Sequence, residues 1–175
     1  MSTLKFPVTD ADHRMGPDDA PVMLVEYGDY ECPHCGRAYP IVREVTRAME
    51  GRLRFVFRHF PLTEAHPHAE HAAEAAEAAG EQHKFWEMHD SLFEGQDALE
   101  DRDLVTRAKL LGLDAARVAE ELIAGVHAER VRRDFRSGMR SGVNGTPTFF
   151  INGVRHDGPW DFESLVDALE VAAGD

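Results

Sequence analysis

The sequence predicts an α/β fold in which helices flank a mixed central sheet and an all-helical segment is inserted between the two parts of that sheet. Two apolar runs with strand character, residues 22–27 and 53–57, enclose an amphipathic helix and form a βαβ unit. Residues 146–156 have the pattern of a hairpin around Asn-Gly, and with the helix at 162–172 they form a ββα unit. Residues 60–142, between the two units, contain only helical patterns. Two such units pair into a mixed sheet.

The N-terminal part of the chain predicts an edge strand, a loop, a central strand and a helix. Residues 4–8 are expected to be a short edge strand, because Pro7 is tolerated in a sheet only at an edge. Residues 9–21, rich in Asp, Gly and Pro, predict a loop. Residues 22–27 are almost continuously apolar, which is typical of a strand covered on both faces. Apolar residues at helical spacing then extend over 32–49.

The middle of the chain predicts successive helices. In residues 68–79, alanines occupy one face and acidic residues another, so we expect the small face to approach a neighbour closely and the acids to face water. The acidic residues are Glu70, Glu74, Glu77 and Glu81. Residues 84–93 carry an aromatic core stripe. Asp101 and Asp114 are expected to be the N-caps of the next two helices.

The helix predicted at residues 126–139 carries the basic cluster of the chain. Val131, Phe135 and Met139 fall on one face of this helix. The basic residues are Arg130, Arg132, Arg133, Arg136 and Arg140. A solvated helix face is the simpler interpretation of this cluster, and a binding patch is the alternative.

The composition indicates a single acidic chain with enough apolar residues for one good core. Of its 175 residues, 19 are basic and 32 are acidic, so the formal net charge is −13. This charge argues against nucleic acid or an anionic membrane as the main partner. No run approaches the roughly 18 apolar residues of a membrane span, and the N-terminus lacks the apolar run of a secretory signal. We therefore expect a cytoplasmic protein with no membrane partner, monomeric or weakly dimeric.

The cysteines form the most specific motif. Cys32 and Cys35, the only two in the chain, lie between a predicted strand and a predicted helix. Cys32 would stand at the helix N-terminus, where unpaired N–H groups and the helix dipole favour a thiolate. Pro33 suits the first helical turn, and we expect His34 to favour the thiolate by its partial positive charge or by a donated hydrogen bond. We therefore assign Cys32 as nucleophile and Cys35 as resolving thiol in thiol–disulfide exchange.

Glu26 and the two cysteines also have alternative interpretations. Glu26 lies inside an apolar strand, where it either pairs with a cation or serves as a proton acceptor near Cys35; composition alone leaves both open. A structural zinc site usually needs a second pair of ligands at short spacing, and the chain has no second cysteine pair. The nearest substitutes are His66, His68 and His71. We therefore expect no metal site and no organic cofactor, and we regard inert packing of the cysteines as the weaker alternative.

Several motifs together resemble a known family. They are Cys-Pro-His-Cys at 32–35, a glutamate six residues before the first cysteine, and Gly-Thr-Pro-Thr-Phe-Phe at 145–150. In these motifs the chain resembles DsbA-like proteins of the thioredoxin-fold superfamily. Gly-Asp-Tyr-Glu before the cysteine motif and Phe-Arg-His-Phe-Pro-Leu at 57–62 look like a soluble bacterial subgroup of DsbA-family proteins.

The resemblance implies a thioredoxin fold with an inserted all-helical lobe. On this basis we expect a discontinuous thioredoxin-like domain at residues 1–60 and 143–175, interrupted by the lobe at 61–142. It also implies that the Thr146–Pro147 peptide is cis and faces the cysteines, and that Thr146 backbone groups bind an extended substrate segment.

The resemblance further implies how the site residues work. The buried acid of the family falls on Glu26, which would handle the proton of Cys35. We expect a dithiol–disulfide oxidoreductase acting on protein or small thiol substrates, with glutathione or the thioredoxin system as redox partner. The direction of electron flow stays open. The alternatives are a noncatalytic peptide-binding or chaperone module that uses the Pro147 groove, and a glutathione-using isomerase or transferase.

Overall fold

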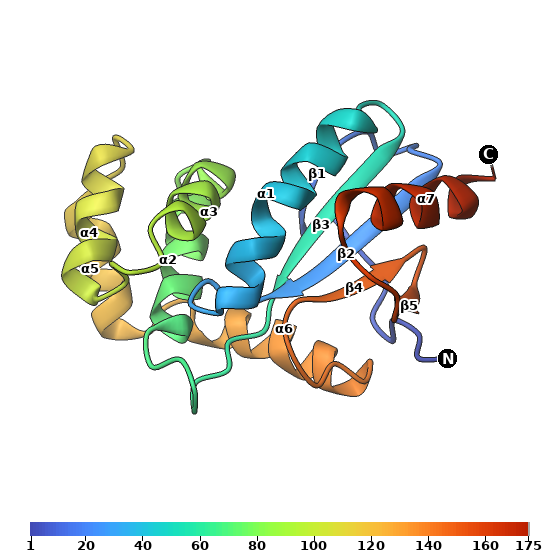
Figure 1. Ribbon diagram of the computed structural model, residues 1–175. Coiled ribbons are helices and arrows are strands. Elements are labelled where there is room, and N and C mark those ends of the chain that lie inside the picture. The colour runs from blue at the N-terminus through green and yellow to red at the C-terminus, as the bar shows by residue number, and fades with distance from the viewer. Residues whose placement is uncertain (175) are drawn as a thin grey trace.

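The computed structural model describes residues 1–174 and has a mixed five-stranded sheet with helices on both faces (Figure 1). In chain order the elements are β1 (His13–Met15), β2 (Val22–Gly28), α1 (Pro33–Ala48), β3 (Leu53–His59), α2 (Ala69–Glu81), α3 (Phe85–Glu94), α4 (Asp101–Leu110), α5 (Ala115–Ala124), α6 (Ala128–Arg140), β4 (Thr148–Ile151), β5 (Val154–His156) and α7 (Phe162–Ala173). The strand order across the sheet is β1-β3-β2-β4-β5. The predicted α/β class and mixed sheet are confirmed.

The sheet is built around β2 and β3, which run parallel with Val25 opposite Val56. β1 pairs with β3, and β4 pairs with β2, both antiparallel; β5 pairs with β4 in the same sense. β2 is therefore the middle strand, which explains its almost continuous apolar sequence: both of its faces must be covered by other residues. The strands predicted at 22–27 and 53–57 are confirmed, and β3 continues to His59.

Side chains alternate along β2 between two cores, as the period of a strand requires. Val22 and Leu24 belong to the larger core, which includes residues of α1, α7 and the inserted helices. Val25 and Tyr27 belong to a smaller core on the opposite face, against which Phe135 of α6 packs. Figure 1 shows the same arrangement, with α1 and α7 on one side of the sheet and α6 on the other.

Helices α2 to α5 form a lobe beside the sheet, and α6 leads back to the sheet (Figure 1). The segment 60–142 contains no strand, as predicted. Ala72 and Ala76, on the small face of α2, share one continuous core with Phe57 of β3. Small side chains permit this close approach of helix and sheet. The lobe and the sheet therefore share a core, and the exact division of the chain into the two parts stays a prediction.

The edge strand predicted at residues 4–8 is wrong. Residues 4–8 form no strand, although Thr3 before them makes a single antiparallel bridge to Val154 of β5. The edge strand beside β3 is β1 at His13–Met15, which lies inside the predicted loop. The carbonyl oxygens of Phe6 and Pro7 accept hydrogen bonds from the Arg58 guanidinium, at 2.9 and 3.1 Å. This segment therefore satisfies part of its backbone with a buried side chain, which no local sequence pattern reveals.

The prediction that all acidic residues of α2 face water is also wrong. Glu74 and Glu77 are only 3% and 7% exposed. α2 packs between the sheet and the other lobe helices, so both of its sides are covered. The Glu77 carboxylate remains buried because two histidines donate hydrogen bonds to it, which lowers the free-energy penalty of burying a charge.

Met139 does not share the environment of Val131: Met139 is 58% exposed and Val131 only 1%. The two residues are eight positions apart on α6. At about 100° per residue, eight residues rotate the side chain by roughly 80° beyond two full turns. Met139 therefore points away from the face that Val131 buries.

The helix cap predicted at Asp114 is confirmed. Asp114 and Asp161 cap α5 and α7 and accept hydrogen bonds from backbone N–H groups of the first turn. The prediction of Asp101 as an N-cap is wrong, because Asp101 is the first residue of α4. The N-cap of α4 is Glu100, which forms a capping box with Asp103.

Candidate active site

The two cysteines lie at the N-terminus of α1, directly after the central strand. β2 ends at Gly28, Cys32 is the N-cap residue, and α1 begins with Pro33. A proline suits this position because the N–H that it lacks would have no partner within the helix. The Asp29 carboxylate shapes the connecting loop, since its Oδ1 accepts from the N–H groups of Glu31 at 2.8 Å and Cys32 at 3.2 Å. Cys32 therefore stands at the positive end of the helix dipole.

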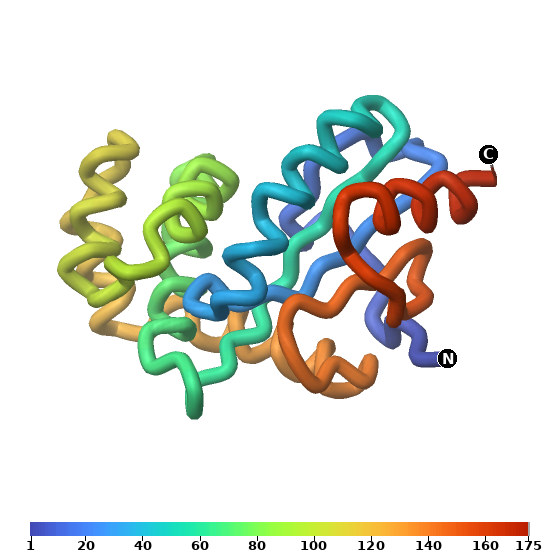
Figure 2. The backbone as a smooth tube through the Cα atoms, viewed as in Figure 1, coloured from blue at the N-terminus to red at the C-terminus, as the bar shows by residue number. Residues whose placement is uncertain are grey.

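The loop before β4 lies against Cys32. Its Thr146–Pro147 peptide bond is cis, and Cys32 Sγ donates a hydrogen bond to the Thr146 carbonyl oxygen at 3.5 Å. In Figure 2 this loop passes beside the first turn of α1. The fold thus brings together two predicted site segments that lie 114 positions apart in the chain.

The surroundings of Cys32 lower the pKa of its thiol to about 5. The largest cause is hydrogen bonding with the Cys35 side chain. Hydrogen bonding with the Thr146 side chain and with the backbone of Cys35 and His34 acts in the same direction, and burial opposes it. The His34 imidazole itself is exposed and contacts the Arg37 guanidinium. Of the two expected effects of His34, the donated hydrogen bond is present, and it comes from the backbone N–H.

The pKa of Cys35 is shifted in the opposite direction to that of Cys32. It is fully buried, and its pKa is raised well above the ordinary value by burial, by the hydrogen bond to Cys32 and by the charge of Glu26. The two cysteines are free thiols in this structure. At neutral pH the pair therefore consists of a thiolate on Cys32 and a thiol on Cys35. A thiolate is the form that attacks a disulfide, and a neighbouring thiol can then resolve the product.

Glu26 is buried beneath the cysteines, with only 2% of its surface exposed. Its Oε1 has no hydrogen-bond partner among residues 1–174. Burial, and then the negative charge of Cys32, raise the pKa of the Glu26 carboxyl to about 8. The carboxyl is therefore mainly protonated at neutral pH while Cys32 is ionised.

Replacing Glu26 by glutamine is expected to change how stability depends on pH. The carboxyl has a pKa of 4.5 in the unfolded chain and about 8 in the folded protein. Between these values the folded state keeps a proton that the unfolded state has released, so the contribution of Glu26 to stability falls as pH rises. Glutamine carries no such proton. The variant should therefore become more stable relative to the wild type across this window, by up to about 1.4 kcal/mol per pH unit.

Urea unfolding of the oxidised proteins at several pH values would measure this difference. Oxidation removes the titration of Cys32 and leaves burial, the main cause of the Glu26 shift. Glu87→Gln, at an exposed site, serves as the matched control and should follow the wild type at every pH. A stability difference between Glu26→Gln and the wild type that stays constant with pH would contradict the assignment.

Gln96 is a site residue that the sequence did not indicate. Its Nε2 donates hydrogen bonds to the carbonyl oxygens of Tyr30 and Cys32, both at 2.9 Å, and so holds the cysteine loop against the lobe. A Cβ at Gly36 would lie 2.1 Å from Gln96 Oε1. The glycine after Cys35 is therefore needed for this close approach, and it is the one local signal that could have indicated a neighbour here.

Asp29 and His66 form a second pair of side chains that stabilises the cysteine loop, and the sequence did not indicate this pair. Asp29 Oδ2 accepts from the Leu62 N–H at 2.9 Å and is paired with His66 Nδ1 at 2.8 Å. Burial opposes protonation of His66, but Asp29 and the charge of Cys32 together raise the pKa of its ring.

The three histidines considered as zinc ligands do not share a site. His66 pairs with Asp29, whereas His71 pairs with Asp101 at 2.6 Å on the surface of the lobe. His68 begins α2 as its N-cap, with its backbone N–H bonded to Glu31 Oε2 at 2.7 Å. These histidines stabilise loops and helix ends.

Comparison with known proteins agrees with this geometry. Residues 8–171 match the thioredoxin family. The chain resembles oxidised BdbD from Bacillus subtilis, with a TM-score of 0.88 and 24% identity over 99% of each chain. It also resembles a thioredoxin-like oxidoreductase from Silicibacter pomeroyi, with a TM-score of 0.84 and 26% identity over 95% of each chain. The expected thioredoxin fold with a DsbA-like arrangement is confirmed.

The curated relatives of higher identity are named Na(+)/H(+) antiporters. The Na(+)/H(+) antiporter NhaA 3 of Salinispora tropica is 51% identical over 160 residues, which are 91% of this chain and 24% of the relative. The antiporter NhaA 1 of Mycobacterium sp. (strain KMS) is 48% identical over 173 residues, 96% of this chain and 28% of the relative. The chain spans about a quarter of the length of these relatives. Within residues 1–174, no helix has both the length and the apolar character of a membrane span.

Proposed function

The chain belongs to the thioredoxin family, and from this premise we propose that it is a thiol–disulfide oxidoreductase with Cys32 as nucleophile and Cys35 as resolving thiol. One observation carries the proposal: two sulfurs at one helix start have pKa values moved in opposite directions, to about 5 for Cys32 and well above the ordinary value for Cys35. Inert packing requires no such contrast. The description of a structural neighbour as an oxidoreductase supports the same function.

The exchange reaction follows from the two protonation states. The Cys32 thiolate attacks one sulfur of a substrate disulfide, so that a bond forms between Cys32 and that sulfur while the other substrate sulfur leaves as a thiolate. Cys35 then loses its proton and attacks the Cys32 sulfur. This step forms the Cys32–Cys35 bond and releases the second substrate sulfur as a thiolate. The substrate has gained two electrons, and the reverse sequence oxidises a dithiol.

Glu26 is suited to receive the proton of Cys35 when Cys35 attacks the mixed disulfide. The Cys32 thiolate is one of the two causes that raise the pKa of the Glu26 carboxyl. In the mixed disulfide Cys32 carries no charge, so the pKa of Glu26 falls and a larger fraction of the carboxyl is ionised. An ionised Glu26 can accept a proton when Cys35 must become a nucleophile.

A small cavity extends from Glu26 toward the protein surface. Its volume is about 20 Å³, and its lining includes Glu26, Tyr39 and Asp90. About 10–15 Å³ of such volume is enough to hold one water molecule. One water here would connect the Glu26 carboxyl to Asp90, which is half-buried, and so provide a route for the proton.

The substrate that this surface suits best is an extended polypeptide or a small thiol. The Thr146 carbonyl is in contact with the Cys32 sulfur, so backbone groups of this loop can pair with a chain whose disulfide lies at Cys32. Glutathione or a thioredoxin-type dithiol would serve as redox partner by the same exchange chemistry.

The alternative functions are less well supported. A noncatalytic peptide-binding module would use the Pro147 groove but would need no lowered pKa at Cys32. A glutathione-using isomerase or transferase would need no resolving thiol beside the nucleophile, whereas Cys35 is hydrogen-bonded to it. We do not assign to this chain the antiport activity in the names of its relatives, since it spans only about a quarter of their length.

Titration of the reduced protein tests the proposal directly. Thiolate absorbance at 240 nm, followed from acid to mildly alkaline pH, should rise with a midpoint near pH 5. The Cys32→Ser variant should lack this transition, and the oxidised wild type provides the baseline. A midpoint near about 8.5, the ordinary cysteine value, would contradict activation of Cys32 and with it the proposed function.

A further inference from the structure

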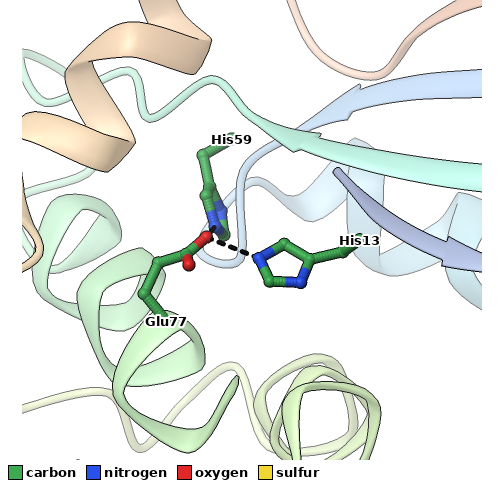
Figure 3. Close-up of side chains that lie close together, drawn as sticks. All are labelled: His13, His59 and Glu77. Atoms are coloured by element: carbon green, nitrogen blue, oxygen red, sulfur yellow. Dashed lines mark hydrogen bonds and ion pairs between the residues drawn. The ribbon is translucent and has the colours of Figure 1, made fainter. Parts of the chain in front are cut away.

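A cluster of three side chains lies where the sheet meets the inserted lobe, and the proposed reaction does not use it (Figure 3). His13 comes from β1, His59 from the end of β3 and Glu77 from α2. Glu77 Oε1 pairs with Nε2 of each histidine, both at 2.8 Å. One ligand atom of each residue lies within 4.8 Å of the other two. We propose that this cluster is a binding site for a divalent transition-metal ion, with zinc as the best match.

The ligand types fit zinc. Two imidazole nitrogens and one carboxylate oxygen are a set that binds Zn²⁺ in proteins, and water can take the fourth position. Zinc bonds of about 2.0–2.2 Å in a tetrahedron separate neighbouring ligand atoms by roughly 3.3 Å. Each nitrogen now lies 2.8 Å from the Glu77 oxygen. If each histidine nitrogen moved about half an ångström away from the Glu77 oxygen, the nitrogen and the oxygen would have the separation of two ligands of one zinc ion.

The two rings are already held in orientation. The His13 ring stacks on Phe85, with centroids 3.5 Å apart and planes within 3°. The His59 ring packs edge-on against Phe57, with centroids 5.6 Å apart and planes at 80°, and the His59 residue is only 1% exposed. A ligand set that is rigid before binding loses little conformational entropy when the metal binds. The His13 side chain, 18% exposed, marks the side from which an ion can enter.

The charges and protons around the cluster also permit binding. The Nδ1 of His59 has no hydrogen-bond partner among the described residues. The ring proton can therefore move from Nε2 to Nδ1, and free Nε2 for the metal, without breaking another hydrogen bond. Arg130 is the cation that acts on Glu77, and it is paired with Asp134. Its repulsion of a metal ion is thus reduced by a neighbouring carboxylate.

Binding would join three segments that lie far apart in the chain. β1 is an edge strand, β3 is central, and α2 belongs to the lobe. A metal bound to one residue of each would cross-link the sheet to the lobe. Because an ion that binds only the folded state stabilises it, the melting temperature should rise with zinc concentration. At about a hundredfold excess over the dissociation constant, the rise should be roughly 5 °C or more.

Isothermal titration with zinc tests the proposal. The protein should be the full, untagged chain with Cys32→Ser and Cys35→Ser, stripped of metal with a chelator, because free thiolates bind zinc themselves. We expect one zinc per chain. Adding His13→Ala or Glu77→Gln should weaken binding by about tenfold or more and reduce the rise in melting temperature at the same zinc concentration.

His71→Ala is the matched control. His71 also pairs with a carboxylate, that of Asp101 at 2.6 Å, but on the exposed surface of the lobe. This variant should bind zinc as the parent does. Absence of stoichiometric binding by the parent, or equal affinity in the parent and the His13→Ala variant, would overturn the proposal. If Glu77→Gln fails to fold, as judged by circular dichroism, His13→Ala on the edge strand still decides.

Discussion

Replacing Cys32 by serine is expected to lower the reduction of insulin by dithiothreitol to the rate of dithiothreitol alone. A serine hydroxyl is not ionised at neutral pH and cannot form a disulfide, so the first step of exchange is lost. The structure makes this effect specific, because the low pKa of about 5 belongs to Cys32 and not to Cys35. Insulin precipitation, measured as turbidity, reports the rate.

Cys35→Ser provides the matched comparison. This variant keeps the nucleophile and loses the resolving thiol, so it should accumulate mixed disulfides between Cys32 and substrate that are visible on a non-reducing gel. Cys32→Ser should form none. Insulin reduction that persists in Cys32→Ser would remove the catalytic assignment and favour the noncatalytic peptide-binding alternative.

Replacing Arg58 by alanine is expected to lower the free energy of unfolding by about 3–5 kcal/mol. Arg58 is 3% exposed, and its guanidinium donates to Asp12 Oδ1 at 2.8 Å and Oδ2 at 3.1 Å. It also donates to the Tyr27 hydroxyl and to the carbonyl oxygens of Phe6 and Pro7, at 2.9–3.1 Å. Alanine would leave a carboxylate and these acceptors without their partner, and buried groups left unpaired are strongly destabilising.

Guanidinium chloride unfolding of the two proteins measures this loss. Arg132→Ala is the control, because its side chain is 60% exposed and its contact with Glu70 is long, 3.8 Å. A surface change of this kind should alter stability by less than about 0.5 kcal/mol. Equal effects of the Arg58 and Arg132 substitutions would show that the N-terminal segment contributes little to the folded state.

Much of the framework was predictable because the signals are local. The apolar run of β2, the amphipathic stripe of α1 and the Asn-Gly turn between β4 and β5 each depend on residues close in sequence. The same holds for the cysteine motif, where Pro33 and the start of a helix indicate one activated thiol. The edge strand was misplaced because backbone groups of residues 4–8 bond distant parts of the chain: the Lys5 N–H donates to Ser141 Oγ, and the carbonyl oxygens of Phe6 and Pro7 accept from Arg58.

The sequence by itself therefore determined the class of fold and the order of its main elements, and it led to the proposal that Cys32 is the reactive thiol. Only the tertiary structure decided which side chains support the site and which acids are buried. Gln96 reaches Cys32 across 64 positions, and Glu77 reaches His13 across the same separation. A periodic pattern shows that a helix has a particular face but not what packs against that face, because that contact depends on how distant segments pack in three dimensions.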